Sequence, residues 1–174
     1  MILQTPRLYL RQFTIDDAPL LVELNSDPAV LQYLHEPPLR DVAHAREILD
    51  TIIFPQYKKG LGRWATFRKE TDEFIGWCGL KFLPERNEID LGYRFIQSFW
   101  GKGYGTEAAG YVLQYGFHQL GLSTIVARAH IDNKASLAII IKLGMHYVAD
   151  EIIDGCPVKT FSLANPTYPT VKEK

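Results

Sequence analysis

The sequence predicts one α/β domain with a mixed sheet of about seven strands and about four helices. The chain has 174 residues, of which 47% are hydrophobic, so it can bury one sizeable core. Residues 63–95 alternate between apolar and polar side chains, as in a meander of antiparallel strands. Residues 88–131 instead follow a strand–helix–strand order, which is typical of a parallel crossover. We expect the domain to cover residues 1–165, with a loose tail over residues 166–174.

The first third of the chain is predicted to hold one strand followed by helices. Apolar alternation in "ILQTPRLYLRQF", residues 2–13, predicts the opening strand. Thr14 is a typical helix N-cap, and Asp16 and Asp17 in the next turn complement the positive end of a helix. A second helical stretch, in one or two pieces, is predicted within residues 27–60, where apolar side chains recur at helical spacing.

The rest of the chain is predicted to alternate between strands and helices. The expected strands are residues 63–69, 73–83, 88–95, 123–131, 147–153 and 158–164. One helix is predicted over Thr106–Leu120. Another covers residues 133–143 and ends at Gly144, because a glycine readily adopts the left-handed conformation of a helix C-cap.

Composition and charge argue against several classes of protein. The formal net charge is −1, from 19 basic and 20 acidic residues, and no basic stripe is present, so we expect no nucleic-acid partner. No apolar run reaches membrane-spanning length, and Arg7 and Arg11 interrupt the apolar start, so we expect neither a signal peptide nor a membrane anchor. Cys78 and Cys156 form no CxxC motif and no histidine cluster accompanies them. We therefore expect no metal site, and two reduced thiols in a cytoplasmic protein.

Three glycines, Gly101, Gly103 and Gly105, lie between a predicted strand and the start of a predicted helix. Without Cβ atoms in the way, successive backbone N–H groups in such a turn can converge on an anion. The helix adds roughly half a positive charge at its N-terminus. Lys102 can add a point charge at the rim. The pattern predicts a phosphate or pyrophosphate site, and the alternative is a tight turn that binds nothing.

Two known phosphate-binding motifs can be compared with this stretch. A P-loop requires Ser or Thr after its Gly-Lys, but Lys102 is followed by Gly103, so this motif is absent. The dinucleotide fingerprint G-x-G-x-x-G/A is matched by Gly103, Gly105 and Ala108, which keeps a Rossmann-type oxidoreductase as an alternative. The strand at residues 88–95 argues against that alternative. It carries charges at alternate positions, whereas strands of a doubly wound sheet are almost continuously apolar.

Two segments together resemble the GNAT superfamily of acyl-CoA-dependent N-acetyltransferases. They are "DLGYRFIQSFWGKGYGTEA", residues 90–108, and "NKASLAIIIKLGM", residues 133–145. "TPRLYLRQF", residues 5–13, resembles the opening of the branch that includes the ribosomal-protein N-terminal alanine acetyltransferases, so the similarity covers nearly the whole chain. Trp100 stands where the superfamily often has Arg or Gln, and tryptophan is familiar there in this branch. The resemblance implies a sheet that is splayed at its central parallel pair, with the cofactor in the gap.

The resemblance also implies which residues hold coenzyme A, with acetyl-CoA as co-substrate. Backbone amides of one loop would wrap the pyrophosphate; this loop comprises Gly101, Lys102, Gly103, Tyr104, Gly105 and Thr106. Tyr93, Arg94 and Phe95 would line the pantetheine arm, as an added strand lines a sheet edge. Asn133 matches the family asparagine that hydrogen-bonds the pantetheine side.

Amine acetylation requires a neutral amine, a polarised thioester carbonyl and a leaving thiolate. A carboxylate can take the proton of the amine, and Glu88 and Asp90 lie two residues apart on one strand face. We prefer Asp90, which is nearer the acyl end; the alternative is that both are ordinary solvent-facing carboxylates. A backbone N–H of residues 92–95 is a candidate oxyanion donor. Ile140 stands where many members have a tyrosine that protonates the thiolate, so Ser136 or water would serve instead.

The sequence thus predicts an acetyl-CoA-dependent N-acetyltransferase that transfers the acetyl group directly to a primary amine in a ternary complex. The acceptor is a protein N-terminus or a small-molecule amine, and residues 31–60 are expected to select it. The missing tyrosine leaves a second reading, a GNAT module that holds acyl-CoA without turnover. The oligomeric state stays open, a homodimer included.

Overall fold

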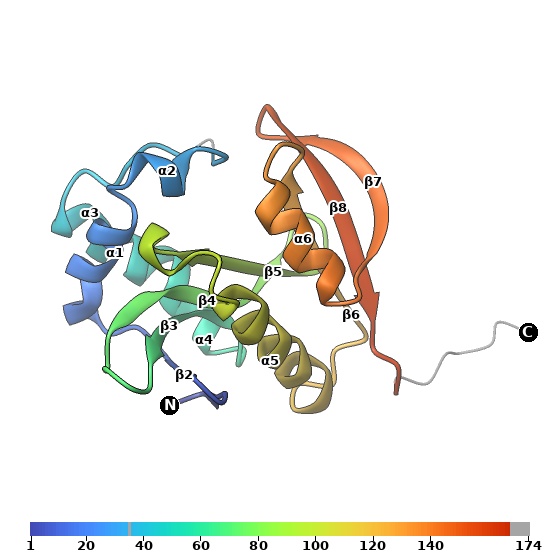
Figure 1. Ribbon diagram of the computed structural model, residues 1–174, viewed down its shortest axis with the longest axis horizontal. Helices are drawn as coiled ribbons and strands as arrows, with labels where there is room; N and C mark the ends of the chain where they lie inside the picture. Colours follow the sequence, from blue (N-terminus) through green and yellow to red (C-terminus); the bar gives the residue numbers. More distant parts are fainter. Residues whose placement is uncertain (35, 168–174) are drawn as a thin grey trace, which may run out of the picture.

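The computed structural model describes residues 1–34 and 36–167, which form one eight-stranded mixed sheet in the order β1-β2-β3-β4-β5-β6-β8-β7 (Figure 1). The strands are β1 (Leu3–Gln4), β2 (Leu8–Arg11), β3 (Gly62–Arg68), β4 (Phe74–Leu83), β5 (Glu88–Phe95), β6 (Thr124–His130), β7 (His146–Ile153) and β8 (Cys156–Ala164). Neighbouring strands in this sheet are antiparallel except for β5 and β6, which are parallel. The predicted mixed sheet is therefore confirmed. A Rossmann fold is excluded, because its sheet is mostly parallel.

The opening segment is a hairpin and not the single strand that alternation predicted. β1 and β2 pair antiparallel, with Leu3 opposite Leu10. The Leu8 backbone N–H donates a 2.9 Å hydrogen bond to the Thr5 hydroxyl oxygen, which closes the turn between the two strands. Pro6 sits in that turn, where its missing N–H costs no ladder hydrogen bond. This hairpin accounts for the eighth strand.

Six α-helical segments occur in the described part of the chain. They are α1 (Ala18–Leu24), α2 (Pro28–Leu31), α3 (Val42–Ile48), α4 (Phe54–Tyr57), α5 (Tyr104–His118) and α6 (Lys134–Lys142). One π-helical turn, Leu49–Ile53, joins α3 to α4, so the predicted second helical stretch is present in several pieces. α5 begins two residues earlier than Thr106, because Gly103 forms its N-cap in a left-handed conformation. Gly144 follows α6 with φ +79°, as predicted.

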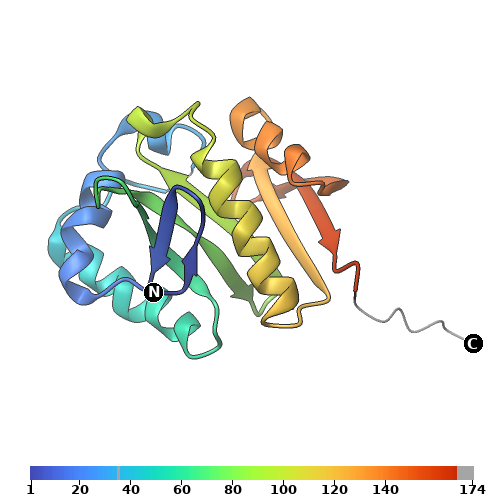
Figure 2. The ribbon, with the colours of Figure 1, turned by 60° about the horizontal axis from the view of Figure 1, so that its bottom comes forward.

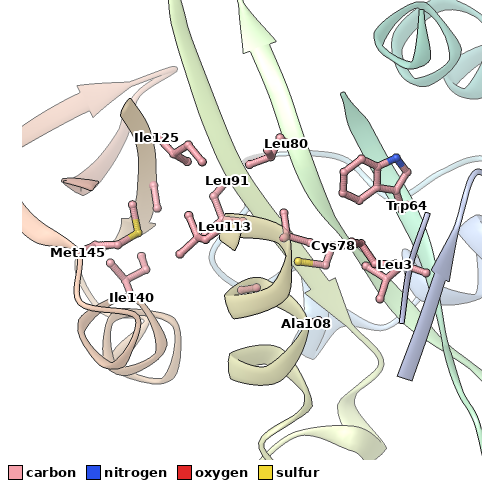
Figure 3. Close-up of a cluster of buried hydrophobic side chains, with 14 of the residues drawn as sticks. Leu3, Trp64, Cys78, Leu80, Leu91, Ala108, Leu113, Ile125, Ile140 and Met145 are labelled. Atoms are coloured by element: carbon pink, nitrogen blue, oxygen red, sulfur yellow. The ribbon is translucent and has the colours of Figure 1, made fainter. Parts of the chain in front are cut away.

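The helices cover both faces of the sheet and create two cores (Figure 2). α5 and α6 pack on one face, which we call the α5 face, through side chains such as Cys78, Leu91 and Ile140 (Figure 3). On the other face, α1 and α3 pack against β3 and β4 through Leu21, Leu49 and other apolar side chains. Helices therefore cover β4 on both faces and β5 on the α5 face, so the side chains of the α5-face core are held in place.

β5 and β6 pair over only a short length and then diverge. Asp90 lies opposite Val126 and Leu91 opposite Ala127, and no later residue of β5 pairs with β6 in the described sheet. β5 nevertheless continues to pair with β4 as far as Phe95. The predicted splay at the parallel pair is therefore confirmed, and it opens toward the glycine loop and the start of α6.

The cysteines, the membrane-spanning potential of the helices and the C-terminal tail were the subject of three further predictions. Cys78 and Cys156 are free, buried thiols. Within residues 1–34 and 36–167, no helix combines the length and the apolar character needed to cross a membrane. Most of the expected loose tail, residues 168–174, lies outside the described residues.

Candidate active site

Gly101, Gly103 and Gly105, at the start of α5, are glycines for different structural reasons. Gly101 and Gly103 have φ angles of +72° and +80°, a left-handed conformation that side chains with a Cβ rarely adopt. Gly105 is needed for packing, because a Cβ there would lie 3.0 Å from Cδ1 of Ile139 on α6. The loop therefore turns sharply into α5 and brings the start of α5 close to α6.

The start of α5 offers unpaired donors to an anion. Its first backbone N–H groups, those of Tyr104, Gly105 and Thr106, have no carbonyl partner within the helix. The helix dipole favours negative charge at this end. The Lys102 ammonium lies 5.4 Å from the centre of the Phe99 ring, at the rim of the loop. These donors and this cation fit a pyrophosphate, so the residues predicted to hold coenzyme A suit that group.

A clamp from the N-terminal hairpin holds the glycine loop, and sequence reasoning did not predict it. Arg7 donates through Nη1 to the Lys102 carbonyl at 3.0 Å and through Nε to the Glu107 carboxylate at 2.6 Å. Glu107 also accepts the Arg7 backbone N–H at 2.9 Å and the Thr5 hydroxyl. The Arg7 guanidinium lies 4.4 Å from the centre of the Tyr104 ring. We call Thr5, Arg7 and Glu107 the hairpin clamp; it fixes both the loop and the first turn of α5.

Tyr93 and Ser136 meet across the splayed gap. The Tyr93 hydroxyl lies 2.9 Å from the Ser136 hydroxyl and donates to the Ser136 carbonyl at 3.2 Å. Burial raises the pKa of Tyr93 to about 12, so its hydroxyl stays protonated at neutral pH. Asn133 caps α6 by accepting the Ser136 backbone N–H at 3.1 Å, which leaves the Asn133 Nδ2 group as a donor. Tyr93 and Ser136, which the sequence predicted as separate site residues, are thus brought together.

Backbone groups of β5 also point toward this gap. The Ile96 N–H donates to the Ile75 carbonyl of β4 at 2.9 Å. Since backbone groups alternate in direction along a strand, the N–H groups of Tyr93 and Phe95 point away from β4, toward β6. The Phe95 carbonyl already accepts the Trp100 indole N–H at 2.7 Å. The two N–H groups are therefore the candidate donors to a carbonyl oxygen held in the gap.

Asp90 lies on the opposite face of β5 with an unusual carboxyl group. Burial raises its pKa to about 6, against the opposing effects of the Arg128, Arg63 and Lys81 cations. Among the described residues, only Arg128 forms an ion pair with Asp90, with its Nη1 3.4 Å from the Asp90 Oδ1. A carboxylate with this pKa can hold a proton and release it near neutral pH. This environment suits a general base.

Glu88 shares that face but is held by its partners. Arg128 forms an ion pair with Glu88 and reaches Glu151 on β7 at 3.5 Å. The Arg128 guanidinium lies closer to the Glu88 carboxylate than to the Asp90 carboxylate, so Glu88 has the stronger ion pair. Of the two predicted carboxylates, Asp90 is therefore the one with the weaker ion pair.

The side chain of Arg94 lies on the Asp90 face of β5, so only its backbone can make the predicted contact with the pantetheine arm. Its guanidinium pairs with Glu36 at 3.0 Å and hydrogen-bonds the Asn25 side chain. Tyr93 and Phe95 have the opposite orientation and pack with the α5-face core. The physical reason is strand alternation: position 94 has the same parity as position 90. Only the backbone of Arg94 remains near the cofactor side.

Ile140 cannot supply a proton. It is 1% exposed and packs in the α5-face core near Met145 and Leu113 (Figure 3). Ser136, one helical turn earlier on α6, carries the nearest hydroxyl to this position along that helix. A proton donor to a leaving thiolate would therefore come from the Ser136–Tyr93 pair or from water.

Comparison with known proteins agrees with this geometry. Residues 7–146 match the family model described as an acetyltransferase (GNAT) domain. The chain is 34% identical over 142 residues to p20, an uncharacterized N-acetyltransferase of Bacillus licheniformis, and the alignment covers 81% of this chain and 80% of p20.

Solved structures share the fold at lower identity. RimL, a ribosomal alpha-N-protein acetyltransferase in complex with coenzyme A, superposes with a TM-score of 0.80 at 18% identity, over 94% of this chain and 97% of RimL. Spermidine N-acetyltransferase from Vibrio cholerae, in complex with CoA and spermine, gives a TM-score of 0.77 at 18% identity, over 92% and 97% of the two chains. The family model and the relative p20 establish that this chain belongs to the GNAT acetyltransferases, as its sequence predicted.

Proposed function

We propose that this protein transfers the acetyl group of acetyl-CoA directly to a primary amine in a ternary complex. The observation that carries the proposal is the two-sided arrangement of β5. The hydroxyl and ring of Tyr93 face the splayed gap and α6, whereas Asp90, with its raised pKa, lies on the other face of the same strand. A cofactor in the gap and an amine beside Asp90 would meet at the strand, and holding them there supplies much of the rate.

Each residue has one task in the proposed reaction. Acetyl-CoA supplies an acetyl group activated as a thioester. The N–H groups of the glycine loop bind its pyrophosphate, and those of Tyr93 and Phe95 bind the oxygen of the carbonyl as negative charge develops. Asp90 takes a proton from the amine, directly or through water, as the amine nitrogen bonds to the carbonyl carbon and the carbon–sulfur bond breaks. The Ser136 hydroxyl gives a proton to the sulfur and is reprotonated through Tyr93 or solvent.

We expect Ser136→Ala to lower kcat about 10-fold, because a positioned proton donor contributes at least this much when the leaving thiolate must be neutralised. KM for acetyl-CoA is expected to stay within about twofold. The loss should shrink above about pH 8.5, where a thiol leaves readily as thiolate. Ser123→Ala, an exposed serine before β6, is the matched control. If Ser136→Ala keeps the wild-type kcat at every pH, water and not Ser136 protonates the leaving thiolate.

Gly103→Ala is expected to raise KM for acetyl-CoA about 5- to 10-fold, because a Cβ at φ +80° costs roughly 1–2 kcal/mol and distorts the anion loop. Gly121→Ala is the matched control. Gly121 has a similar φ of +64° with open space around it, but lies past the far end of α5. Both variants should lose similar stability, and only the Gly103 variant should lose cofactor affinity. Equal KM values in the two variants would contradict the loop assignment.

Release of free thiol from acetyl-CoA in the presence of an amine tests the proposed function. The panel should contain peptides with free N-termini, polyamines and amino acids, because the structurally similar enzymes act on both a protein and spermidine. Acetylated product identified by mass spectrometry would support the proposal. Tight binding of acetyl-CoA with no turnover on any amine would instead favour a module that holds acyl-CoA without reaction.

A further inference from the structure

Arg63 is a partly buried cation that forms no ion pair within the described part of the chain. It lies on β3, and its guanidinium stacks 4.5 Å from the centre of the Trp77 ring. The Arg63 side chain makes no hydrogen bond and no ion pair with any described residue, whereas Arg94 on β5 and Arg128 on β6 are both paired with carboxylates. Burial lowers the pKa of Arg63, and the nearby Arg94 lowers it further. Glu36 and Asp90 oppose these effects from a distance, but neither forms an ion pair with Arg63. A guanidinium stays charged, so its hydrogen-bond donors are available to an anion.

Lys81 is a second cation of the same kind. It lies on β4 opposite Asp90, is half-buried, and forms no ion pair within residues 1–34 and 36–167. Burial lowers its pKa, and Arg63 lowers it further, although Asp90 and other carboxylates oppose this effect. Near Asp90, Arg94 and Arg128 are paired with Glu36 and Glu88, whereas Arg63 and Lys81 form no ion pair with any described residue. An anion from outside would pair with these two cations.

The strand register places Arg63 and Asp90 on one face, with the Trp77 ring beside both of them. Arg63 lies opposite Gly79 on β4, and Gly79 lies opposite Gly92 on β5, two residues from Asp90. Neither glycine carries a side chain on this face, and the Trp77 ring lies across the Gly92 position. The backbones of β3 and β5 are about 10 Å apart. A long arginine side chain spans most of that distance, so one small molecule can reach both charged groups.

We propose that the acceptor is an aminocarboxylate, such as an amino acid, and that Arg63 binds its carboxylate while its amine meets Asp90. This inference rests on the proposed function. A guanidinium binds a carboxylate through two parallel hydrogen bonds, which fixes the orientation of the molecule as well as its charge. A polyamine carries no anion for Arg63 and would be repelled by Arg63 and Lys81. The α-amine of a peptide has no adjacent carboxylate.

Matched acceptors provide the test. Acetyl transfer is measured with each amino acid, with its carboxamide, and with the amine that lacks the carboxyl group. The wild-type protein should show kcat/KM at least about 10-fold higher for the carboxylate than for either analogue. In Arg63→Met, which keeps the packing on Trp77 but not the charge, that preference should disappear through a 10- to 100-fold rise in KM for the carboxylate. Arg63→Lys should restore part of it.

The matched control is Arg68→Met on the same strand, since Arg68 is paired with Glu70 and Glu73. This variant should keep the wild-type preference, and the acetyl-CoA Kd and thermal unfolding of all variants should confirm intact folding. If Arg63→Met affects the carboxylate and its amide equally, or if amides are the better acceptors, the inference is overturned.

The inference can also be tested without turnover, which separates it from the proposed function. Thermal unfolding is followed in the presence of CoA with each amino acid or its carboxamide. Stabilisation by the amino acid alone, abolished in Arg63→Met, would support carboxylate binding even if no acetylation occurs. The same shift with the amide, or no shift with either compound, would overturn it. Absence of turnover with a carboxylate-dependent shift would count against the proposed function only.

Discussion

Replacing Asp90 by asparagine is expected to lower kcat/KM for the amine about 100- to 1,000-fold, because asparagine keeps the shape of the carboxylate but cannot accept a proton. The Kd for acetyl-CoA should not change, since Asp90 lies on the face of β5 opposite the splayed gap. Steady-state kinetics and calorimetric titration with acetyl-CoA measure the two quantities separately. The exposed Asp150 on β7 provides the control variant, Asp150→Asn.

The pH profile identifies the group responsible. Asp90 has a pKa of about 6, so wild-type kcat/KM should rise through pH 6 as the carboxylate forms, and rise again where the amine itself loses its proton. Asp90→Asn should lose the rise near pH 6 and keep the second. If Glu88→Gln removes the rise near pH 6 and Asp90→Asn does not, Glu88 is the general base and the assignment to Asp90 is wrong.

Ionisation of Asp90 is expected to raise the activity of the protein but to lower its stability. The pKa of Asp90 is raised in the folded protein from an ordinary value of 3.8. Its contribution to stability is therefore full below about pH 3.8 and is lost as the pH rises through 6, so the ionised group destabilises the fold at neutral pH. Asp90→Asn should have a Tm equal to or above that of the wild type at pH 7. A variant that loses both stability and activity would indicate a structural role instead.

The features that sequence predicted well are those set by local chemistry. Residues 88–106 contain a strand of alternating charges, glycines with positive φ and the start of a helix. These features follow one another along the chain, so the anion-binding loop can be predicted without knowledge of distant contacts. The same alternation could have placed Arg94 correctly, because its position has the parity of Glu88 and Asp90. The opening hairpin could not be predicted, since a two-residue strand and a four-residue strand on either side of a turn keep the alternation of one longer strand.

The features that sequence did not predict depend on register and on distant segments. Arg7 and Glu107 are 100 residues apart, and no local pattern links them. Arg63 and Arg128 become neighbours of Asp90 only through the pairing of four strands, β3 to β6. Whether a charged strand residue has a partner is equally invisible before folding. The unpaired state of Arg63, on which the acceptor inference depends, could come from the structure alone.

The hairpin clamp should control both stability and cofactor affinity, and Glu107→Ala is its most severe test. Glu107 is 13% exposed and accepts three hydrogen bonds, from the Thr5 hydroxyl and from two N–H groups of Arg7. Removing the carboxylate leaves these donors without a partner and frees the first turn of α5. We expect the free energy of unfolding to fall by about 2–4 kcal/mol, after a discount for the half-exposed Arg7. The Kd for acetyl-CoA should rise at least about 10-fold.

The pH dependence of stability separates the clamp from simple loss of packing. Burial alone would raise the pKa of Glu107, but the hydrogen bonds from Thr5 and Arg7 outweigh it and hold that pKa below its ordinary 4.5. Its contribution is therefore complete above about pH 4.5 and is lost as the pH falls through the lower folded value. The difference in stability between wild type and Glu107→Ala should narrow in acid. A difference that stays constant with pH would mean that volume, and not charge, holds the loop.

Arg7→Met completes a double-mutant cycle with Glu107→Ala. The Arg7 guanidinium bridges Glu107 and the Lys102 carbonyl, so each single variant removes the same link between hairpin and loop. The double variant should therefore raise the Kd for acetyl-CoA little more than either single variant, which is the signature of two residues that act through one contact. Additive losses in affinity would show that Arg7 reaches the cofactor by itself. In that case the second guanidinium nitrogen of Arg7, which lies near Gly103, would be a direct phosphate ligand and not part of a positioning clamp.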